Sequence, residues 1–180
     1  MCDMRLPMGT FMRLAALQFS FLLCCVSAAY AVDNDKYLNH VNTKVAVGSV
    51  SGNTVYAAVT FDIESGWHIC AKEPGDTGMP TVFSFESEEV KEYAIHWPKH
   101  SEIIDKAADK TLKSNAYSGT VVFPVKLEVA EGVKHVRLNV SFAACGPSCI
   151  PQSRIISIDV PEQGFEDSAV LRLIDEWNSK

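Results

Sequence analysis

Two cysteines four positions apart are the residues of this sequence best placed to do chemistry. Cys145 and Cys149 enclose Gly146, Pro147 and Ser148. In a straight strand, residues four apart lie about 13 Å from each other, whereas a disulfide needs Cα atoms about 4.4–6.8 Å apart. The three enclosed residues must therefore fold back if the sulfurs are to meet. Glycine and proline suit such a turn.

A disulfide across this small loop would stabilise the fold only weakly. The chain-entropy model gives about 2 kcal/mol for a five-residue loop, against about 4.7 kcal/mol for a hundred-residue loop. A local pair at the tip of a hairpin is better suited to reversible thiol–disulfide exchange. Spacing alone leaves both interpretations open, a redox pair and a small structural disulfide.

Other chemistry for these thiols has weaker support. Two thiolates with His68 or His135 could bind copper or zinc. The residues after Cys149 lack the His and Met ligands of a cupredoxin. Copper-delivering Sco proteins place their cysteine pair at the start of a helix, whereas this pair precedes an expected strand over residues 154–160. Metal binding is therefore the second interpretation, and no motif nominates the base that a cysteine hydrolase needs.

The segments that must position the pair alternate apolar and polar residues with a period of two, which predicts strands. The expected strands cover residues 43–50, 54–63, 67–70, 81–85, 90–97, 120–129, 133–143 and 154–160. Residues 133–143 and 154–160 flank the cysteines and should form a hairpin. Seven or eight short strands predict an all-β fold, an immunoglobulin-like β-sandwich. The pair is not the bridge of antibody domains, whose cysteines lie far apart in sequence.

Three segments depart from this pattern. Residues 98–116 form the longest polar stretch, which we expect to run over the surface. Pro124 interrupts its strand and indicates an edge strand or a bulge. Residues 166–178 place apolar side chains at helical spacing and predict a short C-terminal amphipathic helix, capped by Asp167 or Ser168.

The amino terminus has the pattern of a secretory signal peptide. Arg5 and Arg13 precede an apolar run that ends in Ala29-Tyr30-Ala31, a small-residue cleavage pattern. We therefore expect residues 1–31 to be a signal peptide, residues 32–165 to form the domain, and residues 166–180 to carry the helix. No second segment is apolar enough to span a membrane, so the mature protein is expected to be soluble.

Composition excludes some classes of function. The chain has 180 residues and a formal net charge of -6, which argues against nucleic-acid binding. Removal of residues 1–31 leaves 149 residues (180 − 31) with 14 Lys+Arg and 21 Asp+Glu, a charge of -7. Three cysteines remain, including Cys70, in the oxidising compartment that export implies. An odd number leaves at least one thiol free or paired with another molecule.

Several separated motifs resemble one protein family. Residues 66–81, GWHICAKEPGDTGMPT, are similar to a motif in the periplasmic N-terminal domains of DsbD- and ScsB-type thiol:disulfide reductases. Trp97-Pro98, residues 117–125 and the Cys145-x-x-x-Cys149-x-Pro151 pattern occur in the same order in that family. The resemblance covers residues 40–160. The four-residue cysteine spacing is that of the ScsB branch.

The resemblance implies an immunoglobulin-like domain whose Cys145–Cys149 pair is redox-active. Such a domain relays electrons from a membrane-embedded or thioredoxin-like donor to oxidised periplasmic proteins, including cytochrome c maturation thioredoxins. It needs no cofactor or metal. The chain ends at Lys180 without a membrane conduit, so we expect donors supplied in trans. By analogy, Cys149 links to partners and Cys145 resolves. Arg154 is the nearest cation in sequence to Cys149, which would favour a thiolate at Cys149.

Other candidate site residues also follow from the resemblance. Trp67, His68 and Pro151 are expected beside the pair. The family shields its disulfide with a cap loop, for which the corresponding residues here are 99–116. That stretch contains no aromatic residue, and Leu112 is its best apolar candidate. The alternative function is a periplasmic copper-binding or non-catalytic interaction module with a structural disulfide.

Overall fold

The computed structural model describes residues 39–85, 88–107 and 110–180. Every described residue belongs to the compact unit Asn34–Lys180. The predicted signal peptide over residues 1–31 lies outside the described residues. Within the described ranges, no helix combines the length and the apolar character needed to cross a membrane.

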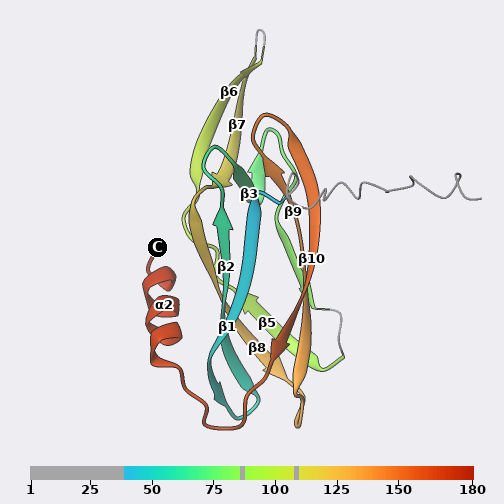
Figure 1. Cartoon of the computed structure of the whole chain (residues 1–180), viewed down its shortest axis with the longest axis vertical. Helices are drawn as coiled ribbons and strands as arrows, with labels where there is room; N and C mark the ends of the chain where they lie inside the picture. The colour runs from blue at the N-terminus through green and yellow to red at the C-terminus, as the bar shows by residue number, and fades with distance from the viewer. Residues whose placement is uncertain (1–38, 86–87, 108–109) are drawn as a thin grey trace, which may run out of the picture. The chain divides into compact units, whose positions relative to one another are not determined.

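The described residues form two antiparallel sheets and one helix (Figure 1). The first sheet has the order β1-β2-β8-β5, with β1 Val41–Ser51, β2 Thr54–Ile63, β8 Thr120–Val129 and β5 Val90–Ile95. The second has the order β10-β9-β3-β7-β6, with β4 also paired to β9. Its strands are β3 His68–Gly75, β4 Val82–Phe85, β6 Ser101–Ala107, β7 Lys110–Tyr117, β9 His135–Cys145 and β10 Cys149–Asp159.

The core lies between the inner faces of the two sheets, as the period-two pattern predicts. Phe61 of β2 packs edge-on against Phe123 of its own sheet, with ring centroids 5.4 Å apart. It also packs edge-on against Phe83 and Phe142 of the second sheet, at 6.0 and 5.5 Å. Aromatic rings prefer this geometry, and their burial dominates core energetics. The predicted all-β, immunoglobulin-like sandwich is confirmed.

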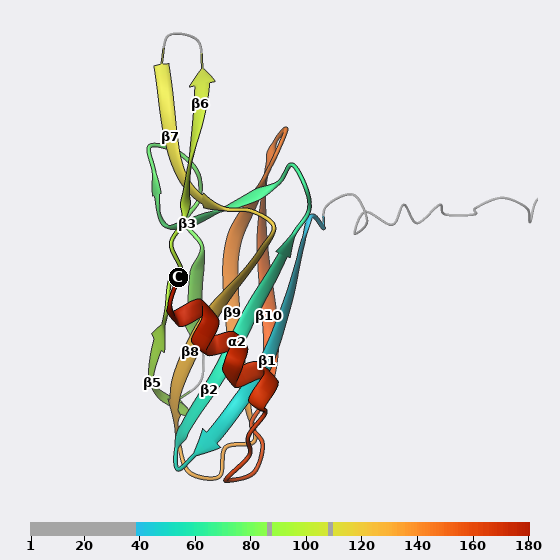
Figure 2. The same ribbon diagram turned by 90° about the vertical axis from the view of Figure 1, so that its left-hand side faces the viewer.

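Helix α2, Ser168–Asn178, covers the outer face of the first sheet (Figure 2). Asp167 is its N-cap, since the Asp167 side chain accepts hydrogen bonds from the backbone N–H groups of Ala169 and Val170. Ile174 is buried against Ala58 and Val122 of the sheet. The predicted helix and the capping by Asp167 are therefore confirmed, with a start two residues later than expected.

The stretch over residues 98–116 is mostly exposed where its side chains are described, as its polar composition suggested, and it is built of regular strands. It forms most of the β6–β7 hairpin, in which Ser101 pairs with Ala116 and Ala107 with Lys110 (Figure 1). The figures show the hairpin extending beyond the strands of both sheets (Figure 2). Only the end of β7, with Ser114, Ala116 and Tyr117, is buried among the described side chains, so most of the hairpin sequence lacks the alternation by which strands are recognised.

Pro124 does not mark an edge strand, because β8 lies between β2 and β5. The Pro124 carbonyl accepts a hydrogen bond from the backbone N–H of His96, so its backbone faces the β5 side. Strand β5 ends one residue earlier, at Ile95. The missing donor of proline therefore falls where this ladder stops, and no interior hydrogen bond of β8 is lost.

Candidate functional site

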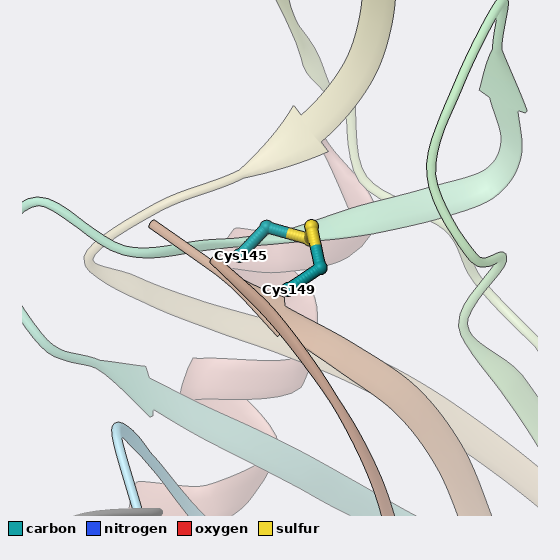
Figure 3. The surroundings of a disulfide bond; sticks show 2 residues. All are labelled: Cys145 and Cys149. Atoms are coloured by element: carbon teal, nitrogen blue, oxygen red, sulfur yellow. A yellow bond between two sulfur atoms is a disulfide. The ribbon is translucent and has the colours of Figure 1, made fainter. Parts of the chain in front are cut away.

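Cys145 and Cys149 form a disulfide between the adjoining ends of β9 and β10 (Figure 3). The two residues are directly opposite each other in the strand register, and their Cα atoms are 4.0 Å apart. The backbone N–H of Gly146 donates to the carbonyl of Ser148 at 3.0 Å. The expected hairpin is confirmed, and both strands extend to the cysteines, so that only the three enclosed residues make the turn.

The two sulfur-bearing residues differ in exposure. Cys145 is 3% exposed, whereas Cys149 is exposed. A thiolate from another molecule must approach a disulfide sulfur directly, so access decides which sulfur it attacks. The arrangement therefore presents Cys149 to solvent and keeps Cys145 as its buried partner.

Trp67 packs against the turn that carries the disulfide. A Cβ atom built on Gly146 would lie 2.9–3.1 Å from three ring atoms of Trp67, which is closer than side chains normally approach. The ring of His40 stacks on the Trp67 indole, with ring centroids 3.6 Å apart. His40 Nδ1 lies 2.6 Å from Glu64 Oε2. Glu64 also accepts the backbone N–H of Trp67 through its carbonyl.

The register also brings His68 and Pro151 to the disulfide. His68, the first residue of β3, pairs with Cys145 on the opposite side from Cys149. Side chains of directly opposed residues in an antiparallel pair project to the same face. Pro151 pairs with Ala143, two residues before Cys145, and is exposed. The structure thus places Trp67 against the disulfide turn, His68 opposite Cys145, and Pro151 two residues after Cys149 on β10.

Leu112 lies elsewhere in the second sheet. It pairs with Asp105 in the β6–β7 hairpin. Strand β7 pairs Tyr117 with Ile69 and Ala116 with Cys70, so its residues before Ala116 run away from His68. Leu112 therefore lies in the β6–β7 hairpin, which stands at the same end of the sandwich as the β9–β10 turn (Figure 1) and is separated from β9 by β3.

Arg154 does not supply a cation to Cys149. The two residues are five apart on β10, and side chains an odd number apart project to opposite faces of a strand. The guanidinium donates to Asn39 Oδ1 at 3.0 Å and to Gln152 Oε1 at 2.6 Å. The expectation drawn from sequence proximity is wrong because it ignored this alternation.

Cys70 is a free, buried thiol. A Cβ atom on Gly78 would lie only 2.3 Å from Cys70 Sγ, so the loop after β3 closes directly over the sulfur. Burial raises the pKa of the Cys70 thiol, and a hydrogen bond from the backbone of Met79 opposes part of that rise. Of the three cysteines that follow the predicted signal peptide, Cys70 is therefore the one outside the disulfide.

The stacking of His40 on Trp67 was not expected from the sequence. His40 precedes Trp67 by 27 positions, and no local pattern links them. Across the described ranges, no group of three or more His, Cys, Asp or Glu side chains is arranged to hold a metal ion.

The sequence model of the family described as thiol:disulfide interchange protein DsbD, N-terminal, matches residues 38–160. Curated protein sequences give no match. The crystal structure of the N-terminal periplasmic domain of ScsB from Proteus mirabilis aligns with a TM-score of 0.67 and 19% identity, over 79% of this chain and 54% of that one.

A second structure, the reduced DsbD N-terminal domain of Neisseria meningitidis, aligns with a TM-score of 0.41 and 13% identity, over 73% of this chain and 90% of that one. The ScsB likeness shows the shared fold, and this chain spans about half the length of that ScsB chain. The family match covers most of the described domain and includes both cysteines of the disulfide. The protein therefore belongs to the family of DsbD N-terminal thiol:disulfide interchange domains.

Proposed function

We propose that this domain is a thiol–disulfide exchange module whose reactive pair is Cys145 and Cys149. It accepts electrons from a thioredoxin-like or membrane-embedded donor supplied in trans and passes them to oxidised periplasmic proteins. These include the thioredoxin-like proteins of cytochrome c maturation. The observation that carries the proposal is the unequal exposure of a local disulfide, with Cys149 open and Cys145 buried. The family to which the chain belongs supports it.

Reduction of the domain begins when a donor thiolate attacks Cys149 Sγ. A mixed disulfide forms, the Cys145–Cys149 bond breaks, and its electron pair leaves on Cys145, which then takes up a proton. The second thiolate of the donor then attacks the donor sulfur in the mixed disulfide, and Cys149 leaves as a thiolate. The donor leaves as a disulfide, and the domain keeps two thiols and two electrons.

Delivery to a substrate runs through the same sulfur. The Cys149 thiolate attacks a substrate disulfide and forms a second mixed disulfide. Cys145 then attacks Cys149 Sγ, which releases the substrate as a dithiol and re-forms the intramolecular bond. Cys149 is thus the linking residue and Cys145 the resolving residue.

The test compares Cys145→Ala with Cys149→Ala, each incubated with thioredoxin as a probe. A linking cysteine without its resolving partner cannot expel the bound protein, so Cys145→Ala should accumulate a mixed disulfide and Cys149→Ala should not. The reverse pattern would exchange the two roles. No complex from either variant, with a reduction potential below about −300 mV, would indicate a structural disulfide.

We also propose that residues 1–31 are removed during export and that the domain acts in the periplasm. The support is the signal-like sequence that ends in Ala29-Tyr30-Ala31. Mass spectrometry of the exported protein should give an N-terminus at Val32. A retained Met1, or a lipid on Cys24 or Cys25, would contradict this processing.

A further inference from the structure

The outer face of the second sheet continues from the disulfide as an open surface. Residues two apart on a strand project to the same side, so the side of β10 that carries Cys149 also carries the alternate residues after it. Neighbouring strands add the residues opposite them in register. We call this surface the cysteine face and define it as Pro151, Ser153, Ile155, Ser141, Asn139 and Val82.

The register makes this surface continuous across three strands. Ser141 of β9 pairs with Ser153 of β10 on one side and with Val82 of β4 on the other. In the next row, Asn139 pairs with Ile155. The Ser153 hydroxyl donates to Asn139 Oδ1 at 3.0 Å, which places both side chains on the same side of the sheet.

The cysteine face carries no acidic or basic residue, although the chain has 38 of them (16 Lys+Arg and 22 Asp+Glu) among 180 residues. Along β9 from Cys145 towards its start, the first charged side chain on this side is Arg137, which pairs with Ser157. The uncharged part of the surface ends there. Depletion of charge, rather than overall apolarity, is what distinguishes the centre of a protein–protein interface from ordinary surface.

Two aliphatic side chains on this face are open to solvent. Ile155 is 66% exposed and Val82 is 48% exposed, and both belong to the few large hydrophobic residues that the described surface presents. Pro151, between them and the disulfide, is also exposed. At about 3.3 Å per residue, Ile155 lies about 20 Å from Cys149 along β10. An ordinary interface covers about 800 Å² on each partner, which is wide enough to include both residues.

We propose that the cysteine face is the docking surface for a thioredoxin-like partner, an inference that rests on the proposed exchange function. A mixed disulfide places a partner sulfur about 2 Å from Cys149 Sγ, so the partner must cover the surface around that residue. Cys149 projects from the same side of β10 as the cysteine face. The partner that fits is a protein whose reactive thiol lies in an uncharged, apolar surround.

The β6–β7 hairpin offers the competing surface and therefore the control. Ile104 of β6 is 57% exposed, which is comparable with Val82 and Ile155. Strands β6 and β7 lie at the same end of the sandwich as the disulfide, but β3 separates them from β9, so Ile104 is not part of the cysteine face. A charge placed on Ile104 changes the net charge of the protein by the same amount without touching the cysteine face.

The experiment introduces Val82→Glu, Ile155→Glu and, as the matched control, Ile104→Glu into the oxidised protein. The rate of disulfide reduction is measured with two reagents, reduced thioredoxin and dithiothreitol. We expect each cysteine-face variant to slow the thioredoxin reaction about tenfold, since a buried charge opposes association at an interface centre. The dithiothreitol rate should stay within about twofold of the wild type in all three variants, because a small dithiol needs no docking surface.

Ile104→Glu should react with thioredoxin like the wild type. Slower reaction of Ile104→Glu, with unchanged rates for the other two variants, would overturn the assignment in favour of the hairpin. A wild-type protein that dithiothreitol reduces but thioredoxin does not would overturn the docking surface and leave exchange chemistry intact. A disulfide inert to both reagents would overturn the proposed function together with the surface.

Discussion

The indole of Trp67 occupies the space that a side chain on Gly146 would need. A Cβ atom there would lie 2.9 Å from Cδ2 of Trp67, and His40 stacks on the indole at 3.6 Å between ring centroids. The disulfide turn is therefore packed against an aromatic pair that is itself held by Glu64. The close approach of the Trp67 ring explains why the residue at position 146 has no side chain.

Gly146→Ala should destabilise the oxidised domain by about 1–3 kcal/mol, the usual range for overpacking, because the added methyl group must displace the Trp67 ring. Urea unfolding of the oxidised protein measures this as a lower midpoint. Ser148→Ala is the control in the same turn. Ser148 is exposed, so its variant should stay within about 0.5 kcal/mol of the wild type. Equal midpoints for Gly146→Ala and Ser148→Ala would show that the ring moves aside freely.

Reduction of the disulfide should change the fluorescence of Trp67, because its ring lies against the turn that the Cys145–Cys149 bond closes. The change is followed on addition of dithiothreitol. It should disappear in Trp67→Phe and persist in Trp97→Phe and Trp177→Phe. Trp97 packs in the core against Phe83, and Trp177 lies beneath the ammonium of Lys180. A signal lost in either of those variants instead would assign the change to another part of the molecule.

Gly78→Ala should destabilise the domain more than Gly132→Ala. Both glycines have positive φ, +100° and +79°, so alanine pays a similar backbone penalty of about 1–2 kcal/mol at each. Only at Gly78 would the new Cβ meet another atom, Cys70 Sγ at 2.3 Å, whereas nothing lies within 4 Å at Gly132. We expect a difference of about 1–3 kcal/mol in the free energy of unfolding.

The control for that comparison is Gly78→Ala combined with Cys70→Ala, which removes the sulfur from the collision. The double variant should lose less stability than the sum of the two single variants, since they act on one contact. Additive losses, or equal effects of Gly78→Ala and Gly132→Ala, would rule out the contact as the cause.

The three cysteines should be alkylated in a fixed order after reduction. Cys149 is exposed and reacts first, Cys145 is buried, and burial both shields Cys70 and raises its pKa. Since the thiolate is the reactive form, a raised pKa lowers the reactive fraction of Cys70 at neutral pH and recovers it only as pH rises. Iodoacetamide labelling at neutral pH, followed by peptide mass spectrometry, should find Cys70 modified only on unfolding. Modification of Cys70 as fast as Cys149 would mean that the loop over it opens.

The sequence determined most of the fold because most strands bury one face. Residues 54–63 alternate in composition, and that alternation becomes Val55, Val59 and Phe61 in the core. The amphipathic spacing in the last segment likewise became a helix whose Ile174 is buried. In the β6–β7 hairpin, burial is confined to Ser114, Ala116 and Tyr117 at the end of β7 among the described side chains, and composition carried no such signal. Tertiary pairing alone made those residues strands.

The sequence also determined the reactive pair, since Cys145, Cys149 and the three residues between them are local. Which cysteine is exposed, and what surrounds it, was decided only by the tertiary structure. His40, Trp67 and Gly146 come from separate parts of the chain, and strand register brought His68 opposite Cys145. Register also joined Val82 to Ser153 through Ser141. Pairing between distant strands depends on the packing of the whole sandwich, and a shift of one residue would reverse every such relationship.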